Sequence, residues 1–134
     1  MSIETTLAII KPDAVERNLI GNIIKMIEEN GLRIKKIKSH FLTEIEAKKF
    51  YEVHKTKAFY DKLIAYMTSG MIIVMLIEGE NAITKYRQLI GSTNPDDAEE
   101  GTIRKLYSID GTRNAVHGSD SKENAITEIQ FFFA

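Results

Sequence analysis

The run from Met71 to Ile77 is the longest purely aliphatic stretch of the chain, and it constrains the fold more than any other segment. It follows a Ser-Gly pair, which is typical of a break between elements. A short continuous apolar run of this kind predicts a central β-strand that is buried on both faces. It is far too short to cross a bilayer, which takes about 20 residues in a helix.

Periodicity along the rest of the chain predicts three more strands. They are expected at Thr5–Ile10, at Leu32–Phe41 and briefly at Ala115-Val116. In the second of these, apolar and basic residues alternate, with an imperfection at Lys35-Lys36. The basic side chains of that strand are interpreted as a solvated face rather than a binding patch.

Helical patterns lie between these strands. They are expected up to Arg17, along Ile20–Ile27, from Thr43 to about Val53, from about Ala58 to Met67, from Asn81 to Ile90, and from the stretch after His117 to Phe133. Thr43 with Glu46 matches a capping box. Residues 92–113 lose their period and predict a long loop with one turn near Thr102, and loops of this length are usually functional.

This order of elements predicts the α+β class and one domain over residues 1–134. It is consistent with a ferredoxin-like βαββαβ antiparallel sheet, a two-layer α/β sandwich with helices packed on one face. Periodicity alone leaves other α+β topologies open. Phe131, Phe132 and Phe133 end the last helix, and we expect them to pack inside the fold or at an interface.

The composition narrows the class of protein. Apolar residues make up 43% of the 134-residue chain and charged residues 28%, a balance typical of soluble globular proteins. The formal charge of −1 argues against an extended nucleic-acid surface, although a local cation cluster for a small polyanion stays possible. There is no cysteine and no signal-like N-terminus, so we expect a cytoplasmic protein without a membrane span.

One polar motif carries the candidate chemistry: Asn114-Ala115-Val116-His117-Gly118-Ser119-Asp120-Ser121. Asp120 with Glu123 matches a capping box, and Ser119 or Ser121 is an alternative cap. We therefore expect His117 just outside a helix N-terminus, where the backbone favours anions. An imidazole nucleophile in that place suits phosphoryl transfer. On the local pattern alone, a loop histidine without a task is the more common interpretation.

The motif resembles the active-site signature N-x-x-H-G-S-D-S of the nucleoside diphosphate kinase family, and further matches run from Thr6 to Phe132. The resemblance implies the ferredoxin-like topology. It also implies reversible ping-pong transfer of the γ-phosphate from ATP to a nucleoside diphosphate through a phosphohistidine at His117. No P-loop motif is present, so nucleotide phosphates must be bound in another way.

The resemblance also implies site roles. Glu128, which leans from the last helix toward the histidine, orients His117 with the help of Ser119, and Tyr51 acts near the γ-phosphate. The remaining roles fall to residues scattered along the chain: Arg87, Thr93 and Arg104 for the phosphates, Lys11 and Asn114 for the sugar, Lys11 also for the transferred group, Phe59 and Leu63 for the base, and Asp120 for Mg²⁺ through water. Arg17 and Arg113 are interpreted as structural pairing partners, and His40 and His54 as structural or surface residues.

The sequence departs from the family pattern at Glu100, at Lys105-Leu106-Tyr107 and at Gly111, where the family often has valine in the base pocket. Two other functions stay open: a histidine phosphotransferase with a protein acceptor, and a non-catalytic ferredoxin-like binding module. The resemblance implies a homo-oligomer built from dimers, a tetramer or hexamer. Nucleoside di- and triphosphates are the expected partners, with no specific nucleic acid.

Overall fold

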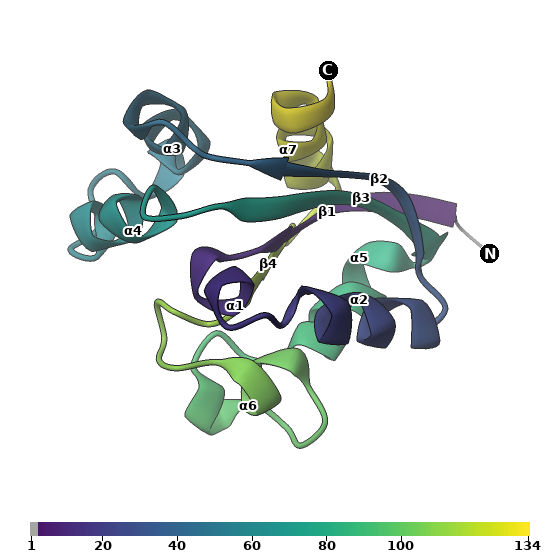
Figure 1. The fold of residues 1–134 in the computed structure, drawn as a ribbon. Helices are drawn as coiled ribbons and strands as arrows, with labels where there is room; N and C mark the ends of the chain where they lie inside the picture. The colour runs from purple at the N-terminus through teal and green to yellow at the C-terminus, as the bar shows by residue number, and fades with distance from the viewer. Residues whose placement is uncertain (1–2) are drawn as a thin grey trace.

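A four-stranded antiparallel sheet lies at the centre of the fold, with strand order β2-β3-β1-β4 (Figure 1). The structure is a computed structural model, and it describes residues 3–134. The strands are β1 (Ile3–Ile10), β2 (Arg33–His40), β3 (Ile72–Glu80) and β4 (Val116–Gly118). The aliphatic run forms most of β3, between β2 and β1, and its first four strand residues are buried as predicted.

Seven α-helices and two 3-10 helices lie between these strands or after the last one within residues 3–134. They are α1 (Pro12–Glu16), α2 (Ile20–Glu29), α3 (Glu44–Phe50), η1 (Glu52–His54), α4 (Tyr60–Met67), α5 (Ala82–Ile90), η2 (Pro95–Asp97), α6 (Ile103–Tyr107) and α7 (Lys122–Phe133). The capping box at Thr43 is confirmed, because its side chain accepts from the Glu46 N–H and Glu46 accepts in return. No helix in this part of the chain is long and apolar enough to span a membrane.

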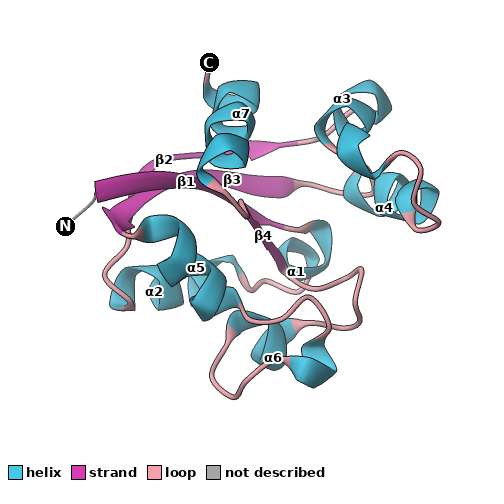
Figure 2. Cartoon of the chain, turned by 180° about the vertical axis from the view of Figure 1, so that it is seen from behind, coloured by secondary structure: helices cyan, strands magenta, loops and turns pink. Residues whose placement is uncertain are grey.

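Helices cover both faces of the sheet, so the expected cover on one face only is wrong. In β1, Ala8 and Ile10 pack in a core with α1, α2 and α5, whereas Leu7 and Ile9 pack in a second core with α3, α4 and α7. Figures 1 and 2 show α7 on one side of the sheet and α2 and α5 on the other. The physical reason is that both faces of β1 and β3 are apolar and must be removed from water.

Two irregular stretches of the sequence have a structural cause. The broken alternation at Lys35-Lys36 coincides with a register shift in the pairing of β2 with β3, between Ile34 and Lys36. The long loop holds more structure than the predicted single turn, since η2 and the five-residue helix α6 lie within it. It begins where Gly91 ends α5 at a φ of 87°, a conformation that favours glycine.

His117 lies inside a strand rather than at the mouth of a helix. β4 pairs with β1 so that His117 stands opposite Ile9, and α7 begins only at Lys122. The N-cap is Ser121, whose side chain accepts from the Asn124 N–H at 3.1 Å. The capping box predicted at Asp120 is therefore wrong and the alternative cap at Ser121 is confirmed. The local pattern missed this because the pairing partner of β4 lies over a hundred residues away in sequence.

Candidate active site

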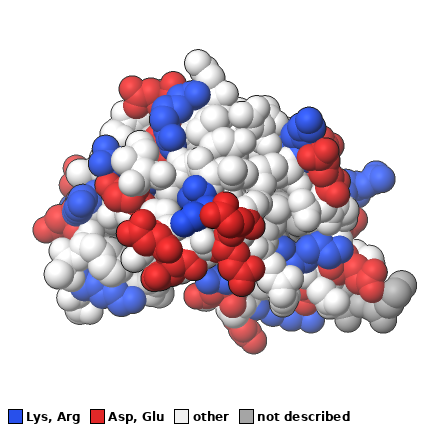
Figure 3. All heavy atoms as spheres, turned by 90° about the horizontal axis from the view of Figure 1, so that it is seen from below, with Lys and Arg blue, Asp and Glu red and all other residues white. Residues whose placement is uncertain are grey.

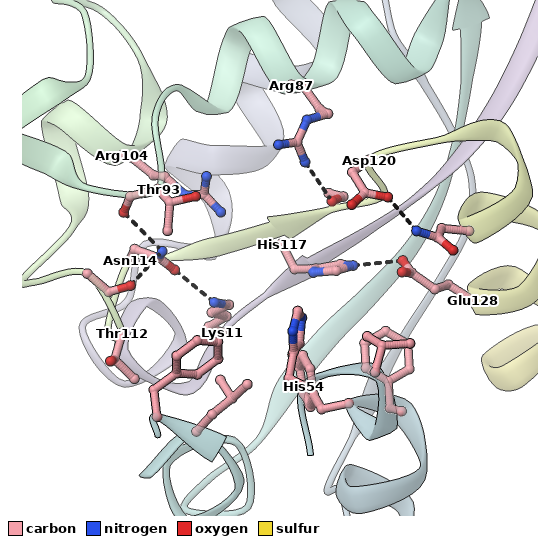
Figure 4. A pocket seen from close by; sticks show the side chains of 18 residues that line it. Lys11, His54, Arg87, Thr93, Arg104, Thr112, Asn114, His117, Asp120 and Glu128 are labelled. Atoms are coloured by element: carbon pink, nitrogen blue, oxygen red, sulfur yellow. Dashed lines mark hydrogen bonds and ion pairs between the residues drawn. The ribbon is translucent and has the colours of Figure 1, made fainter. Parts of the chain in front are cut away.

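A cavity of about 460 Å³ opens at the carboxyl end of β1, between α4, α5, α7 and the long loop. Most of the site residues predicted from the sequence line this cavity, although they come from widely separated parts of the chain (Figure 4). They are Lys11, Tyr51, Phe59, Leu63, Arg87, Thr93, Arg104, Asn114, His117, Asp120 and Glu128. Ser119 lies behind the wall, fully buried, and reaches the cavity only through Glu128.

His117 is held at one ring nitrogen by a carboxylate. Its Nε2 lies 2.7 Å from Glu128 Oε1, which also accepts a hydrogen bond from the Ser119 hydroxyl at 2.8 Å. Figure 4 shows the imidazole extending from β4 to meet Glu128 on α7. A neutral imidazole that donates from Nε2 keeps its lone pair on Nδ1. Nδ1 is thus the nitrogen that this pairing leaves available for chemistry.

Gly118 fixes how closely β4 approaches α5. A Cβ at this position would lie 2.9 Å from the ring of Tyr86, a fully buried residue of α5. Because glycine has no side chain, β4 packs directly on α5, and Arg87 of that helix donates to the Gly118 carbonyl oxygen at 3.2 Å. The glycine after the histidine therefore brings a guanidinium group to the cavity.

Two arginines face the cavity without carboxylate partners. Arg104 donates to the carbonyl oxygens of Gly91 and Val116, each at 3.0 Å. Within residues 3–134 neither Arg87 nor Arg104 forms an ion pair. Burial lowers the pKa of Arg104 to about 10, still well above neutral pH. Their positive charge is left for an anionic ligand, and guanidinium forks suit phosphate oxygens.

Lys11 and Asn114 are buried side chains in the wall of the cavity. The Lys11 Nζ donates to Asn114 Oδ1 at 2.8 Å, and the Asn114 amide donates to the carbonyl oxygens of Thr93 and Gly111 at 3.2 and 3.1 Å. Asn114 therefore ties the lysine to both ends of the long loop. Burial, followed by the nearby charge of Arg104, lowers the pKa of Lys11 to about 7.

The other predicted residues lie around this centre. Tyr51 is buried, which raises the pKa of its hydroxyl, and within residues 3–134 that hydroxyl has no hydrogen-bond partner. Phe59 is 46% exposed at the mouth, next to the buried Leu63. Asp120 accepts from the Asn124 amide at 2.5 Å and also lines the cavity.

His54 is a cavity residue that the sequence analysis assigned to the structure or surface. Its ring lies 6.4 Å from that of Tyr51 and 5.6 Å from that of Phe59, between centroids, and Figure 4 shows it pointing into the cavity. Burial and the charge of Lys57 lower its pKa. The signal that could have found it is its spacing of three from Tyr51, which sets both on one side of a helical turn.

The remaining structural interpretations hold. His40 pairs with Glu46 at 3.2 Å, Arg17 with Asp13 at 3.0 Å and Arg113 with Asp110 at 2.8 Å. Of the departures from the family pattern, Glu100 lies exposed, as do Lys105 and Leu106 of α6. Gly111 lines the cavity, and a Cβ there would meet no atom within 4 Å. This wall of the cavity is therefore open where a valine would narrow it.

A carboxylate-held histidine, two arginines without carboxylate partners and a buried lysine, gathered in one cavity of a ferredoxin-like fold, define a phosphotransferase that works without a P-loop. The comparisons with known proteins identify the class more closely. The family model described as nucleoside diphosphate kinase matches residues 4–134. The chain belongs to the nucleoside diphosphate kinase family, whose enzymes transfer phosphate between nucleotides.

Individual relatives agree with this assignment. The nucleoside diphosphate kinase of Persephonella marina is 53% identical over 134 residues, covering 100% of this chain and 96% of that protein. The one from Nitratiruptor is 56% identical over 131 residues, with 98% and 96% covered. Among solved structures, the Aquifex aeolicus nucleoside diphosphate kinase has a TM-score of 0.97 at 38% identity, covering 99% of this chain and 96% of that one.

Proposed function

We propose that the chain catalyses ping-pong transfer of the γ-phosphate from ATP to a nucleoside diphosphate, with Nδ1 of His117 as the nucleophile. The observation that carries the proposal is the pairing of His117 Nε2 with Glu128, inside a cavity that also contains Lys11, Arg87 and Arg104. This arrangement supplies a nucleophile that is held at Nε2 and, from the two arginines, the positive charge that phosphoryl transfer requires.

In the first half-reaction the Nδ1 lone pair attacks the γ-phosphorus and the bond to the bridging β-oxygen breaks, so that ADP leaves. In the second, the terminal oxygen of a nucleoside diphosphate attacks the same phosphorus and the N–P bond breaks. In both half-reactions the Nε2–H group donates a hydrogen bond to Glu128, whose negative charge stabilises the positive charge that develops on the ring. Ser119 holds Glu128, and the free hydroxyl of Tyr51 is a donor for the transferred group.

We assign nucleotide binding to the rest of the cavity. Arg87, Arg104 and Thr93 take the β- and γ-phosphates, while Lys11 and Asn114 take the sugar hydroxyls, with Lys11 near the transferred group. Phe59 stacks on the base at the mouth and Leu63 lines it. Because every base has a π-face, stacking on Phe59 implies low base selectivity. Gly111 supports the same expectation, since it places no side chain in the cavity wall that could exclude one base and admit another.

Mg²⁺ fits this cavity as a cofactor held with the nucleotide. In residues 3–134 no group of three or more His, Cys, Asp or Glu side chains is arranged to hold a metal. Asp120 supplies one carboxylate in the cavity wall, and Mg²⁺ typically uses one or two carboxylates, water and substrate phosphates. When bound, the ion would neutralise charge on the phosphate oxygens.

We also propose that the protein works in the cytoplasm and that it forms a homo-oligomer, a tetramer or hexamer built from dimers. The support for the oligomer is a set of large apolar side chains exposed on a single chain: Ile3, Ile37, Phe41, Ile45 and Val53. Ile37 lies on β2, an edge strand of the sheet, where another chain can pair. Size-exclusion chromatography with light scattering tests this, and a monomer at micromolar concentration would refute it.

A transfer assay tests the activity against its rivals. Purified protein is incubated with Mg²⁺, ATP and either GDP or dCDP, and nucleotide products are separated by chromatography. We expect GTP and dCTP from the wild type and none from His117→Ala, which removes the nucleophile. A protein-directed phosphotransferase would form phosphohistidine and ADP but no GTP or dCTP, and a binding module would form no phosphohistidine and no new triphosphate. On the face seen in Figure 3, acidic and basic side chains are interspersed, which disfavours the nucleic-acid form of that module.

A further inference from the structure

An aromatic cluster joins His117 to the end of α7. The ring centroid of Phe50, the last residue of α3, lies 5.6 Å from that of His117, with the two planes at 68°. Behind it, Phe50 lies 5.4 Å from Phe131 and 5.3 Å from Phe132. Phe131 and Phe132 are themselves in edge contact at 4.9 Å. These separations fall in the range of favourable aromatic pairs.

The hydrogen bond that His117 donates to Glu128 does not restrain the imidazole completely. In a histidine, Nε2 lies nearer than Nδ1 to the axis of the Cβ–Cγ bond, so rotation about that bond moves Nδ1 further than Nε2. This terminal torsion is intrinsically broad. A partner at Nε2 therefore fixes the far end of the ring, while the direction in which Nδ1 faces needs a second restraint.

We propose that Phe50 is a positioning residue for His117, and that Phe131 and Phe132 hold it in place. The proposal rests on the proposed function, in which Nδ1 of His117 is the nucleophile. The Phe50 ring limits rotation of the imidazole and so aims Nδ1 at the γ-phosphorus. It touches no reacting atom in the proposed reaction.

This assigns a task to the terminal phenylalanines. Phe132 is buried in the core between α7 and the sheet, and Phe131 and Phe133 are partly buried against it. Glu128 lies one turn earlier on the same helix, so α7 restrains His117 twice: directly through the carboxylate and indirectly through the aromatic cluster. The two restraints act on different motions of one ring.

The test compares Phe50→Leu, which removes the flat ring but keeps the site apolar, with Phe50→Tyr, which keeps the ring. Phe133→Leu is the matched control. Phe133 lies at the same end of α7, against Lys36 and Lys38, and within residues 3–134 it is not one of the rings paired with Phe50. Three quantities are measured: the NMR order parameter of the His117 ring, the single-turnover rate of His117 phosphorylation by ATP, and kcat and KM for transfer to GDP.

We expect Phe50→Leu to lower the ring order parameter and to slow phosphorylation and kcat by about tenfold, with KM changed less than about twofold, because misaligned reactants lose rate. Phe50→Tyr and Phe133→Leu should match the wild type in all three. Equal ring order in Phe50→Leu and Phe133→Leu would overturn the proposal. The ring measurement needs no activity, so it is informative even if wild-type protein forms no phosphohistidine and the proposed function fails.

Discussion

At Glu128, a single oxygen atom connects two side chains of the site. Oε1 accepts from both His117 Nε2 and the Ser119 hydroxyl, so one carboxylate oxygen serves both donors. A glutamine at this position would turn its carbonyl oxygen toward the two donors, because its NH₂ group cannot accept from either. Charge and orientation can therefore be separated by substitution at this residue.

Glu128→Gln should keep the direction of the imidazole but lose the negative charge beside it. We expect kcat to fall about tenfold for Glu128→Gln and about 100-fold for Glu128→Ala, in line with the usual cost of losing a group that orients a functional histidine. Steady-state kinetics with ATP and GDP measures this. Equal losses in the two variants would show that the charge contributes everything and the orientation nothing.

Lys11 makes stability depend on pH. Its pKa falls from 10.5 in an ordinary setting to about 7 in the folded chain, mainly through burial. Between these values the unfolded chain binds a proton at Lys11 that the folded chain does not, so the free energy of unfolding rises with pH across this window. The slope approaches about 1.4 kcal/mol per pH unit in the middle of it.

Urea unfolding at pH 7.5 and pH 9.5 measures the effect, with Lys11→Met as the control that lacks the titrating amine. The wild type should gain stability relative to Lys11→Met as the pH rises. Parallel pH dependences in the two proteins would mean that Lys11 stays charged in the folded chain.

At the scale of elements, the site depends on how β4 sits between β1 and α5. Gly118 allows this contact, since a Cβ there would lie 2.9 Å from Tyr86 and 3.2 Å from Ile90. Gly118→Ala should therefore destabilise the fold by about 1–3 kcal/mol, the usual cost of overpacking a core, and should move Arg87 relative to His117.

Gly21→Ala is the matched control, because Gly21 lies in α2 with no atom within 4 Å of an added Cβ. This change should stabilise the fold by about 0.5 kcal/mol through helix propensity. Thermal unfolding of the two variants gives the comparison. A neutral Gly118→Ala would contradict the close contact between β4 and α5.

The predicted elements show what local sequence can reveal. The aliphatic run predicted β3, and Thr43 with Glu46 predicted the start of α3, because both signals depend on neighbouring residues. The position of His117 in β4 and the cover on both sheet faces were missed, since both arise from contacts between distant segments. His54 was missed for the same reason, as its setting depends on Phe59 and the cavity.

The site residues were a different case. Lys11, Arg87, Arg104 and Glu128 are spread over most of the chain, and their spacing alone does not bring them together. The resemblance to a family named them, and the sheet brings them to one cavity: Lys11 directly follows β1, β4 carries His117 and α7 carries Glu128.

For the whole molecule, two cores share one sheet. Tyr86 lies in the core with α1, α2 and α5, and Tyr51 in the core with α3, α4 and α7, while β1 contributes to both. We expect the two cores to unfold together, because β1 belongs to both and unfolding of the sheet in one core removes it from the other. Fluorotyrosine NMR during urea unfolding, at fixed protein concentration, should give one midpoint for both residues. Two separate midpoints would contradict a single domain over residues 1–134.

The central claim is that His117 carries the phosphoryl group between two nucleotides. Its most direct test is to incubate the protein with Mg²⁺ and ATP that is labelled in the γ-phosphate, without an acceptor. The label is mapped by peptide mass spectrometry, and GDP is then added. The account predicts acid-labile label on His117 that leaves entirely as GTP. Label on any other residue, or label on His117 that GDP does not remove, would contradict it.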